Sequence, residues 1–191
     1  MYFNSFEFAI FFLVVLFAFW AMHRNRVART ILLLVASYYF YMCWNWKFAG
    51  LILFSTVLDY FAGLKMYSTK SQRLRKWCLV ASLTGNLGAL GVFKYYGFFA
   101  ESVKVMFGAI GLRMSVAQWN IILPVGISFY TFQTLSYTID IYSGTLKPTR
   151  NFLDFALFVS FFPQLVAGPI VRAAQFLPQL KKKPRFDDRA V

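Results

Sequence analysis

The sequence predicts an all-α, polytopic transmembrane helical protein. Three observations predict this class: 59% of the 191 residues are hydrophobic, only 14% are charged, and the apolar residues gather in long runs. A hydrocarbon layer of about 30 Å needs about 20 helical residues at about 1.5 Å each, and several runs reach that length. We therefore expect about five spanning helices, an interfacial helix and a broken re-entrant segment.

Five apolar runs are the candidate spans. They cover residues 6–22, 27–46, 48–67, 77–96 and 119–141. Tryptophan residues fall near the ends of these runs, as the aromatic belts at the two membrane surfaces require. The first run has no basic stretch before it and no small-residue cleavage site after it, so we predict a spanning helix there and not a cleaved signal peptide.

The lysine and arginine residues between the runs predict the orientation. Three of them follow the first run, one follows the second and five follow the third. By the positive-inside rule, the amino terminus lies outside and the first and third connections are cytoplasmic. The fourth connection, residues 97–118, is then external, and its apolar spacing predicts a helix in the membrane surface. Loop basicity also explains the net charge of +13, so we expect no nucleic acid partner.

The fifth run carries a row of polar and small residues on one helical face. This face recurs every three or four residues and consists of Gly126, Tyr130, Gln133, Tyr137, Asp140 and Gly144. The opposite face consists of Val125, Phe129, Phe132 and Ile139. One acid at the bilayer centre costs about 2.5–3.5 kcal/mol, so protein or water must cover the polar face. Two explanations stay open: hydrogen bonds that only join helices, or the lining of a substrate path.

Pro163, Gly168 and Pro169 interrupt the next apolar run, residues 152–171. Irregular backbone at membrane depth is tolerated only where protein buries it or where it lines a wet cavity. A complete crossing would also leave the six cations from Arg172 to Arg189 outside, against the positive-inside rule. We therefore predict a re-entrant segment that enters and leaves on the cytoplasmic side and faces the same hollow as the polar face.

Three further polar residues stand out in or beside the apolar runs. Asp59 is a functional candidate because acids are rare inside membranes, although pairing with Lys65 or a loop arginine explains it equally well. Asn86, among closely spaced glycines, predicts an interhelical hydrogen bond. His23 lies in a basic turn without a nearby acid, so we assign it no catalytic role. No metal-ligand cluster, phosphate-binding glycine loop or nucleophile motif is present in the sequence.

Four stretches of the chain together resemble a known family. They are STVLDYFAGL (55–64), VFKYYGFF (92–99), LPVGISFYTFQTLSYTIDIYSG (123–144) and FFPQLVAGPIVRAAQFLPQL (161–180). In this order they resemble the membrane-bound O-acyltransferase (MBOAT) family, in its bacterial alginate O-acetyltransferase and D-alanyl-lipoteichoic acid branch. The similarity runs through essentially the whole chain.

The resemblance implies a ring of helices around a tunnel. An acyl group, expected to be acetyl, would pass from a cytoplasmic thioester donor, such as acetyl-CoA or an acyl carrier, to hydroxyls of a cell-envelope or exported polysaccharide. The resemblance also implies a bacterial cytoplasmic membrane location, membrane lipids and an external partner acyltransferase as neighbours, and no bound cofactor. The family's catalytic histidine belongs to a later helix. We therefore expect residues 1–191 to be the N-terminal part of a single MBOAT-type domain, inactive alone.

By motif match, seven residues are expected to line or shape the donor path. They are Gln133, Tyr137, Asp140, Tyr142, Gln164, Pro169 and Arg172. Arg172 is expected to meet phosphate or carrier-protein charge at the cytoplasmic mouth. No catalytic or metal-binding residue is expected in this stretch. Two other classes stay open from the residues alone: a transporter or flippase with a broken-helix site, and a membrane scaffold without chemistry.

Overall fold

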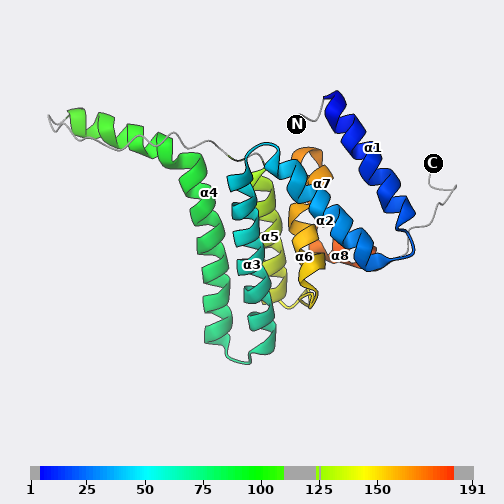
Figure 1. Cartoon of the computed structure of the whole chain (residues 1–191). Helices are drawn as coiled ribbons and strands as arrows, with labels where there is room; N and C mark the ends of the chain where they lie inside the picture. Colours follow the sequence, from blue (N-terminus) through cyan, green and yellow to red (C-terminus); the bar gives the residue numbers. More distant parts are fainter. Residues whose placement is uncertain (1–4, 110–123, 125, 183–191) are drawn as a thin grey trace.

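The computed structural model describes residues 5–109, 124 and 126–182, and the regular structure of these residues is entirely helical. The helices are α1 (Phe6–Ala21), α2 (Arg26–Met42), α3 (Trp46–Ser68), α4 (Gln72–Ala109), α5 (Ile127–Tyr142), α6 (Phe152–Ser160), α7 (Phe162–Ala167) and α8 (Ala173–Lys181). Figure 1 shows a central bundle of α2, α3, α5 and α6, with α4 against α3 and α1 at the opposite side. The predicted all-α class is confirmed.

One of the described helices, α3, is both long and apolar enough to cross a membrane. The first three predicted runs coincide closely with α1, α2 and α3, but five spanning helices are not shown. With 16 residues, α1 is apolar yet reaches only about 24 Å at about 1.5 Å per residue. In α2, Arg26 and Arg29 occupy the first turn, which reduces its apolar length.

The fourth predicted run continues much further than expected. α4 is one helix of 38 residues, which includes the predicted span at 77–96 and residues 97–109 of the predicted interfacial helix. The part of the predicted interfacial helix that the structure describes is helical, and it follows the predicted span without an intervening loop because no proline interrupts this stretch. The buried residues of α4 are Ser82, Asn86 and Leu90, and its later part turns away from the bundle in Figure 1.

The helix α5 begins later than the predicted run at 119–141. Its N-cap is Gly126, whose φ of 77° lies in the left-handed region that favours glycine. Residues 119–123 and 125 of that run lie outside the described residues. So do residues 110–118 of the predicted interfacial helix and the cations after Lys182.

The segment from α6 to α8 is broken, as predicted. After α6 ends at Ser160, α7 starts with Pro163 in its first turn, where a missing N–H leaves no helical hydrogen bond unmade. Residues 168–172 are not helical, and α8 then packs back beside α6. The rings of Phe158 and Phe176, from α6 and α8, lie 5.7 Å apart. The backbone therefore reverses its direction within this segment.

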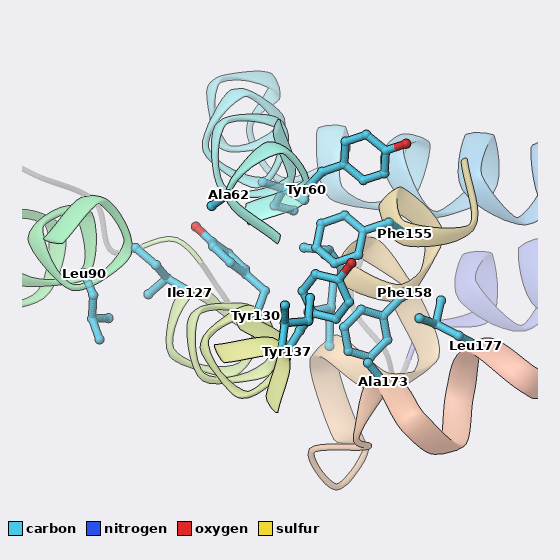
Figure 2. Close-up of a cluster of buried hydrophobic side chains, with 14 of the residues drawn as sticks. Tyr60, Ala62, Leu90, Ile127, Tyr130, Tyr137, Phe155, Phe158, Ala173 and Leu177 are labelled. Carbon is cyan, nitrogen blue, oxygen red and sulfur yellow. The ribbon is translucent and has the colours of Figure 1, made fainter. Parts of the chain in front are cut away.

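A cluster of buried aromatic side chains joins α3, α5 and α6 (Figure 2). The Tyr137 ring of α5 lies 4.5 Å from the Phe155 ring of α6, measured between centroids, and Tyr60 of α3 lies 5.9 Å from Phe155. Each such aromatic pair contributes about 0.5–1.5 kcal/mol beyond the burial of area. This packing fixes the face that α5 turns toward the broken segment.

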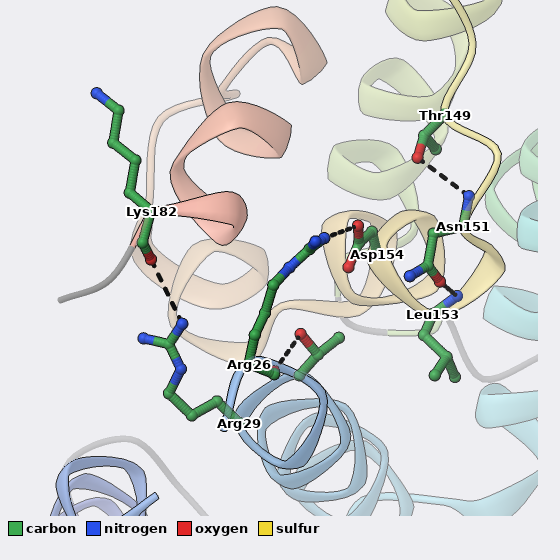
Figure 3. A network of polar contacts seen from close by, with 8 residues as sticks. Arg26, Arg29, Thr149, Asn151, Leu153, Asp154 and Lys182 are labelled. Carbon is green, nitrogen blue, oxygen red and sulfur yellow. Dashed lines mark hydrogen bonds and ion pairs between the residues drawn. The ribbon is translucent and has the colours of Figure 1, made fainter. Parts of the chain in front are cut away.

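Arginine contacts gather three connections at one end of the bundle. Arg26 of α2 pairs with Asp154 of α6, and Arg29 donates to the Lys182 carbonyl oxygen at 3.4 Å (Figure 3). Arg75, in the first turn of α4, donates to the Tyr142 carbonyl oxygen at 2.7 Å. The positive-inside prediction places the first, third and fifth connections and the end of α8 on the same side of the membrane, so it requires them to lie at one end of the bundle. The cytoplasmic location of this end stays a prediction.

Side-specific labelling tests the re-entrant arrangement. In a chain with Cys43 and Cys78 replaced by alanine, we expect cysteines at Lys147 and Lys182 to react with an impermeant maleimide from the same side of the membrane. Both lysines are exposed, and both lie at the end of the bundle where Arg29 meets the Lys182 backbone. Lys47→Cys, exposed at the start of α3, is the control and should react from the other side. Reaction of Lys147→Cys and Lys182→Cys from opposite sides would contradict re-entry.

Candidate functional site

The polar face of α5 turns into the bundle over its first part, whereas Asp140 is partly exposed and Gly144 is exposed. Tyr130, Gln133 and Tyr137 are at most 2% exposed. Three apolar side chains of the opposite face are at least 41% exposed: Phe129, Phe132 and Ile139. The prediction that protein covers the polar face is confirmed for these residues, whereas Val125 lies outside the described part of the chain.

Gln133 satisfies a backbone group that the break after α6 sets free. Its Nε2 donates to the Phe158 carbonyl oxygen at 2.6 Å. In a continuous helix this carbonyl would accept from the N–H of Phe162, four residues on. The break at Phe161 removes that partner, and an unpaired backbone group inside a membrane costs several kcal/mol. Gln133 therefore supplies from α5 the hydrogen bond that α6 has lost.

Ser37 of α2 satisfies the other half of the same break. The Phe162 N–H donates to Ser37 Oγ at 3.2 Å, and the Ser37 hydroxyl donates to the Leu33 carbonyl oxygen at 2.7 Å. Ser37 is fully buried. We call Gln133 and Ser37 the break brace, because together they hold the two backbone groups that would otherwise pair with each other. Sequence reasoning missed Ser37, although a small polar residue inside an apolar run is a signal for an interhelical contact.

The other expected path residues fall into two groups. Tyr137 and Gln164 are buried: the Tyr137 hydroxyl accepts from the Thr149 N–H at 3.3 Å, and Gln164 Nε2 has no partner in the described part of the chain. Asp140 and Tyr142 are partly exposed at the end of α5, and their carbonyl oxygens accept hydrogen bonds from the following loop and from Arg75. Two residues of the link before α8 are exposed: Pro169 and Arg172.

These contacts bear on the two explanations of the polar face. The hydrogen bond of Gln133 joins helices, as the simpler explanation predicts, yet it does so at the one place where the backbone is broken. None of the seven expected path residues lines either of the two cavities that the structure shows beside α1. Their role in lining a donor path stays a prediction.

A second buried polar cluster joins α3, α4 and α5. Asp59 accepts a hydrogen bond from the Ser82 hydroxyl at 2.6 Å and bonds from Asn86 Nδ2 at 2.9 and 3.0 Å. Ser82 Oγ also lies 3.2 Å from Thr138 Oγ1. All four side chains are fully buried. We call them the Asp59 cluster.

The alternative that Asp59 pairs with Lys65 or a loop arginine was wrong. Asp59 faces α4, so its hydrogen-bond donors are the neutral side chains of Ser82 and Asn86, while Lys65 is exposed to the surroundings. Ser82 and Asn86 lie four residues apart on α4, which places them on one face. That spacing was the signal that could have identified Asp59's partners, and the predicted interhelical bond of Asn86 is confirmed.

In the Asp59 cluster the Ser82 hydroxyl donates to a carboxylate, but both side chains are fully buried, so this pair is not open to a substrate in the described structure. Over residues 5–109, 124 and 126–182, no three His, Cys, Asp or Glu side chains come close enough to hold a metal ion. His23 is exposed, and its Nδ1 lies 2.9 Å from the Trp20 carbonyl oxygen of its own turn. The described arrangement can brace a broken helix and fix the positions of α3, α4 and α5 relative to one another.

Comparison with known proteins found relatives along nearly the whole chain. It is 36% identical over 191 residues to a probable alginate O-acetylase AlgI of Pseudomonas syringae pv. tomato, covering 99% of the chain and 36% of the relative. It is 39% identical over 163 residues to the probable alginate O-acetylase AlgI of Azotobacter vinelandii, covering 84% of the chain and 32% of the relative.

A relative of a second kind is a peptidoglycan O-acetyltransferase of Helicobacter pylori. The chain is 34% identical to it over 184 residues, covering 84% of the chain and 34% of the relative. The chain thus spans about a third of the length of the relatives it matches. No protein-family model and no solved structure matches the chain.

Proposed function

Because the chain is homologous over nearly its whole length to the N-terminal third of MBOAT-type O-acetyltransferases, we propose that it forms the front part of a membrane O-acyltransferase. The acyl group is acetyl, since the alginate and peptidoglycan relatives are both named for O-acetyl transfer. The acceptor is a hydroxyl of a cell-envelope or exported polysaccharide, as alginate and peptidoglycan are.

The cation-rich end of the bundle is the proposed entry for the acyl donor. Arg24, Lys147 and Lys182 are exposed there, and the Arg26, Arg29 and Arg75 contacts hold the surrounding connections together. A thioester donor carries negative charge, either as coenzyme A phosphates or as an acidic carrier protein. Exposed cations attract both kinds of donor. This grouping supports a cytoplasmic donor side.

The transfer itself requires a base and an oxyanion site. The acceptor oxygen attacks the thioester carbonyl and loses its proton to a general base, and the thiolate leaves. The resemblance implies that this base is a histidine of a later helix. Within the described residues, the proposal assigns a positioning role to the break brace and no proton transfer.

The break brace is the geometric observation that carries the proposal. Irregular backbone at membrane depth persists only where protein or a wet cavity satisfies its polar groups. Gln133 and Ser37 do this for Phe158 and Phe162 from two different helices. The bracing keeps the broken segment from α6 to α8 fixed beside the polar face of α5, which is where the proposed donor path lies.

Substitution of Gln133 tests the proposed function. In cells that carry the gene, we expect Gln133→Leu to lower the O-acetyl ester content of the envelope polysaccharide at least about ten-fold, because a displacement of about 1 Å near a reacting group costs up to about a hundred-fold. Base-released acetate, normalised to the amount of protein in the membrane, is the measurement. Deletion of the gene should remove the same ester.

Phe132→Leu is the matched control for Gln133→Leu. It introduces the same residue one position away, on the face of α5 that is exposed, and Phe132 is 49% exposed. We expect ester formation within about two-fold of the unchanged protein, since such surface substitutions usually have small effects. If the Gln133→Leu variant forms as much ester as the unchanged protein, the Gln133 hydrogen bond is only a packing contact and does not support transfer. Unchanged esters after gene deletion would contradict the proposed function.

A further inference from the structure

Two adjoining cavities form a groove between α1 and the broken segment. One has a volume of about 210 Å³ and the other of about 200 Å³, and both are lined by Phe19, Leu33 and Phe161. The second cavity is otherwise apolar, with Phe12, Leu16 and Pro163 in its wall. The first cavity also carries polar side chains, those of Arg29, Thr30 and Gln179. The groove is therefore apolar along its length and cationic at one end.

Among the residues that the structure describes, none supplies an anionic partner for the buried cation of Arg29. It is only 6% exposed, and its Nε has no hydrogen-bond partner in the described part of the chain. Its remaining contacts are a hydrogen bond of 3.4 Å to the Lys182 carbonyl oxygen (Figure 3) and the Phe19 ring, whose centroid lies 5.4 Å from Cζ. The neighbouring Arg26 is already paired with Asp154. A buried guanidinium is stable only when an anion or several acceptors satisfy it.

The outer face of α1 is apolar and exposed. It presents Ile10, Leu13, Val14 and Phe17 to its surroundings, and Phe17 is 71% exposed. An exposed apolar face of this kind suits contact with lipid acyl chains, and α1 forms one wall of the groove. Lipid molecules therefore have access to the groove along α1.

We propose that this groove binds one anionic phospholipid. Its phosphate pairs with Arg29, with the Gln179 amide as a further hydrogen-bond donor, and an acyl chain lies along Leu33 and Phe161 toward Pro163. A groove that is apolar along its length and cationic at one end is complementary to a lipid with an acyl chain and a negatively charged headgroup. None of the seven expected path residues lines the groove, so it is distinct from the proposed donor path. The cationic end is also the predicted cytoplasmic end, where anionic lipids are concentrated.

Co-purification of lipid tests the proposal. The chain is placed in nanodiscs of equal phosphatidylglycerol and phosphatidylcholine, released into mild detergent, and weighed with its retained lipid by native mass spectrometry. We expect retained phosphatidylglycerol to exceed phosphatidylcholine, and Arg29→Gln to lower that ratio about five-fold, the usual effect of one cation at an anionic surface. Leu33→Trp, which adds bulk to the wall shared by both cavities, should lower the retention of both lipids.

Arg24→Gln is the matched control. Arg24 lies in the connection just before α2, is exposed and does not line the groove, so its loss removes the same charge without touching the groove. An equal fall in the ratio for Arg24→Gln and Arg29→Gln would overturn the proposal in favour of diffuse attraction. Equal retention of the two lipids by the unchanged chain would also overturn it, as would displacement of the lipid by glycerol 3-phosphate alone. If Arg29→Gln does not fold, two other variants replace it in the test. Arg29→Lys keeps the charge and should retain the lipid, whereas Leu33→Trp should lose it.

Discussion

Asp59→Leu is expected to lower the free energy of unfolding by about 3 kcal/mol. The substitution removes the acceptor of three buried hydrogen bonds and leaves the Ser82 hydroxyl and the Asn86 amide without it. Each buried polar group left unsatisfied costs about 1–3 kcal/mol, and interhelical hydrogen bonds in membranes contribute about 0.6 kcal/mol each, with a maximum of about 1.7. Unfolding of the purified chain in mixed micelles, followed by circular dichroism against denaturant, measures the change.

Two variants separate the loss of hydrogen bonds from the change of shape. Asp59→Asn keeps an acceptor oxygen for Ser82 and Asn86, so we expect it to cost no more than about 1 kcal/mol. The triple variant Asp59→Leu, Ser82→Ala, Asn86→Leu removes the orphaned donors as well. Since replacing all partners by apolar groups is often close to neutral, it should recover part of the lost stability. If Asp59→Leu is as stable as the unchanged chain, the Asp59 cluster does not hold α3, α4 and α5 together.

Gly126→Ala is expected to cost about 2–4 kcal/mol. A Cβ at this position would lie 2.6 Å from the Tyr41 hydroxyl oxygen and 3.1 Å from the Leu165 carbonyl oxygen. Tyr41 is buried and the second contact is backbone, so neither can move away easily. Crowding of a packed core costs about 1–3 kcal/mol, and the φ of 77° adds about 1–2 kcal/mol for a residue with a side chain. The same unfolding assay measures the loss.

Gly144→Ala is the control for Gly126→Ala. The φ of Gly144 is 81°, so the backbone strain is comparable, but a Cβ there meets nothing within 4 Å. We expect it to cost only about 1 kcal/mol. The difference between the two variants then measures the close approach of α2, α5 and α7 around Gly126. Equal costs would show that this approach is looser than the structure indicates.

The broken segment shows how far the sequence alone can predict the site. Pro163, Gly168 and Pro169 predicted the break, and the spacing of Tyr130, Gln133 and Tyr137 predicted a covered polar face. The sequence could not assign Gln133 to the Phe158 carbonyl oxygen, or Ser37 to the Phe162 N–H. These partners are 25 and 125 residues apart, and nothing local to either residue names the other.

Expectations that depended on apolar length alone were less successful. Apolar runs located α1, α2 and α3 well, but α4 runs on to Ala109 because no helix-breaking residue stops it, and one described helix by itself has the length and composition of a span. Hydropathy measures how well a residue tolerates lipid. It does not measure where backbone hydrogen bonding ends, which depends on proline, on capping groups and on neighbouring helices.

The sequence by itself determined the helical class, the inward face of α5, the position of the break and the gathering of cations in the connections. These properties follow from composition and from a period of about 3.6 residues, which are local to the chain. The tertiary structure decided which groups satisfy one another: the break brace, the Asp59 cluster and the placement of Arg29 in a groove beside α1. Such pairings depend on the rotation and axial offset of helices that are distant in sequence, and packing sets these quantities.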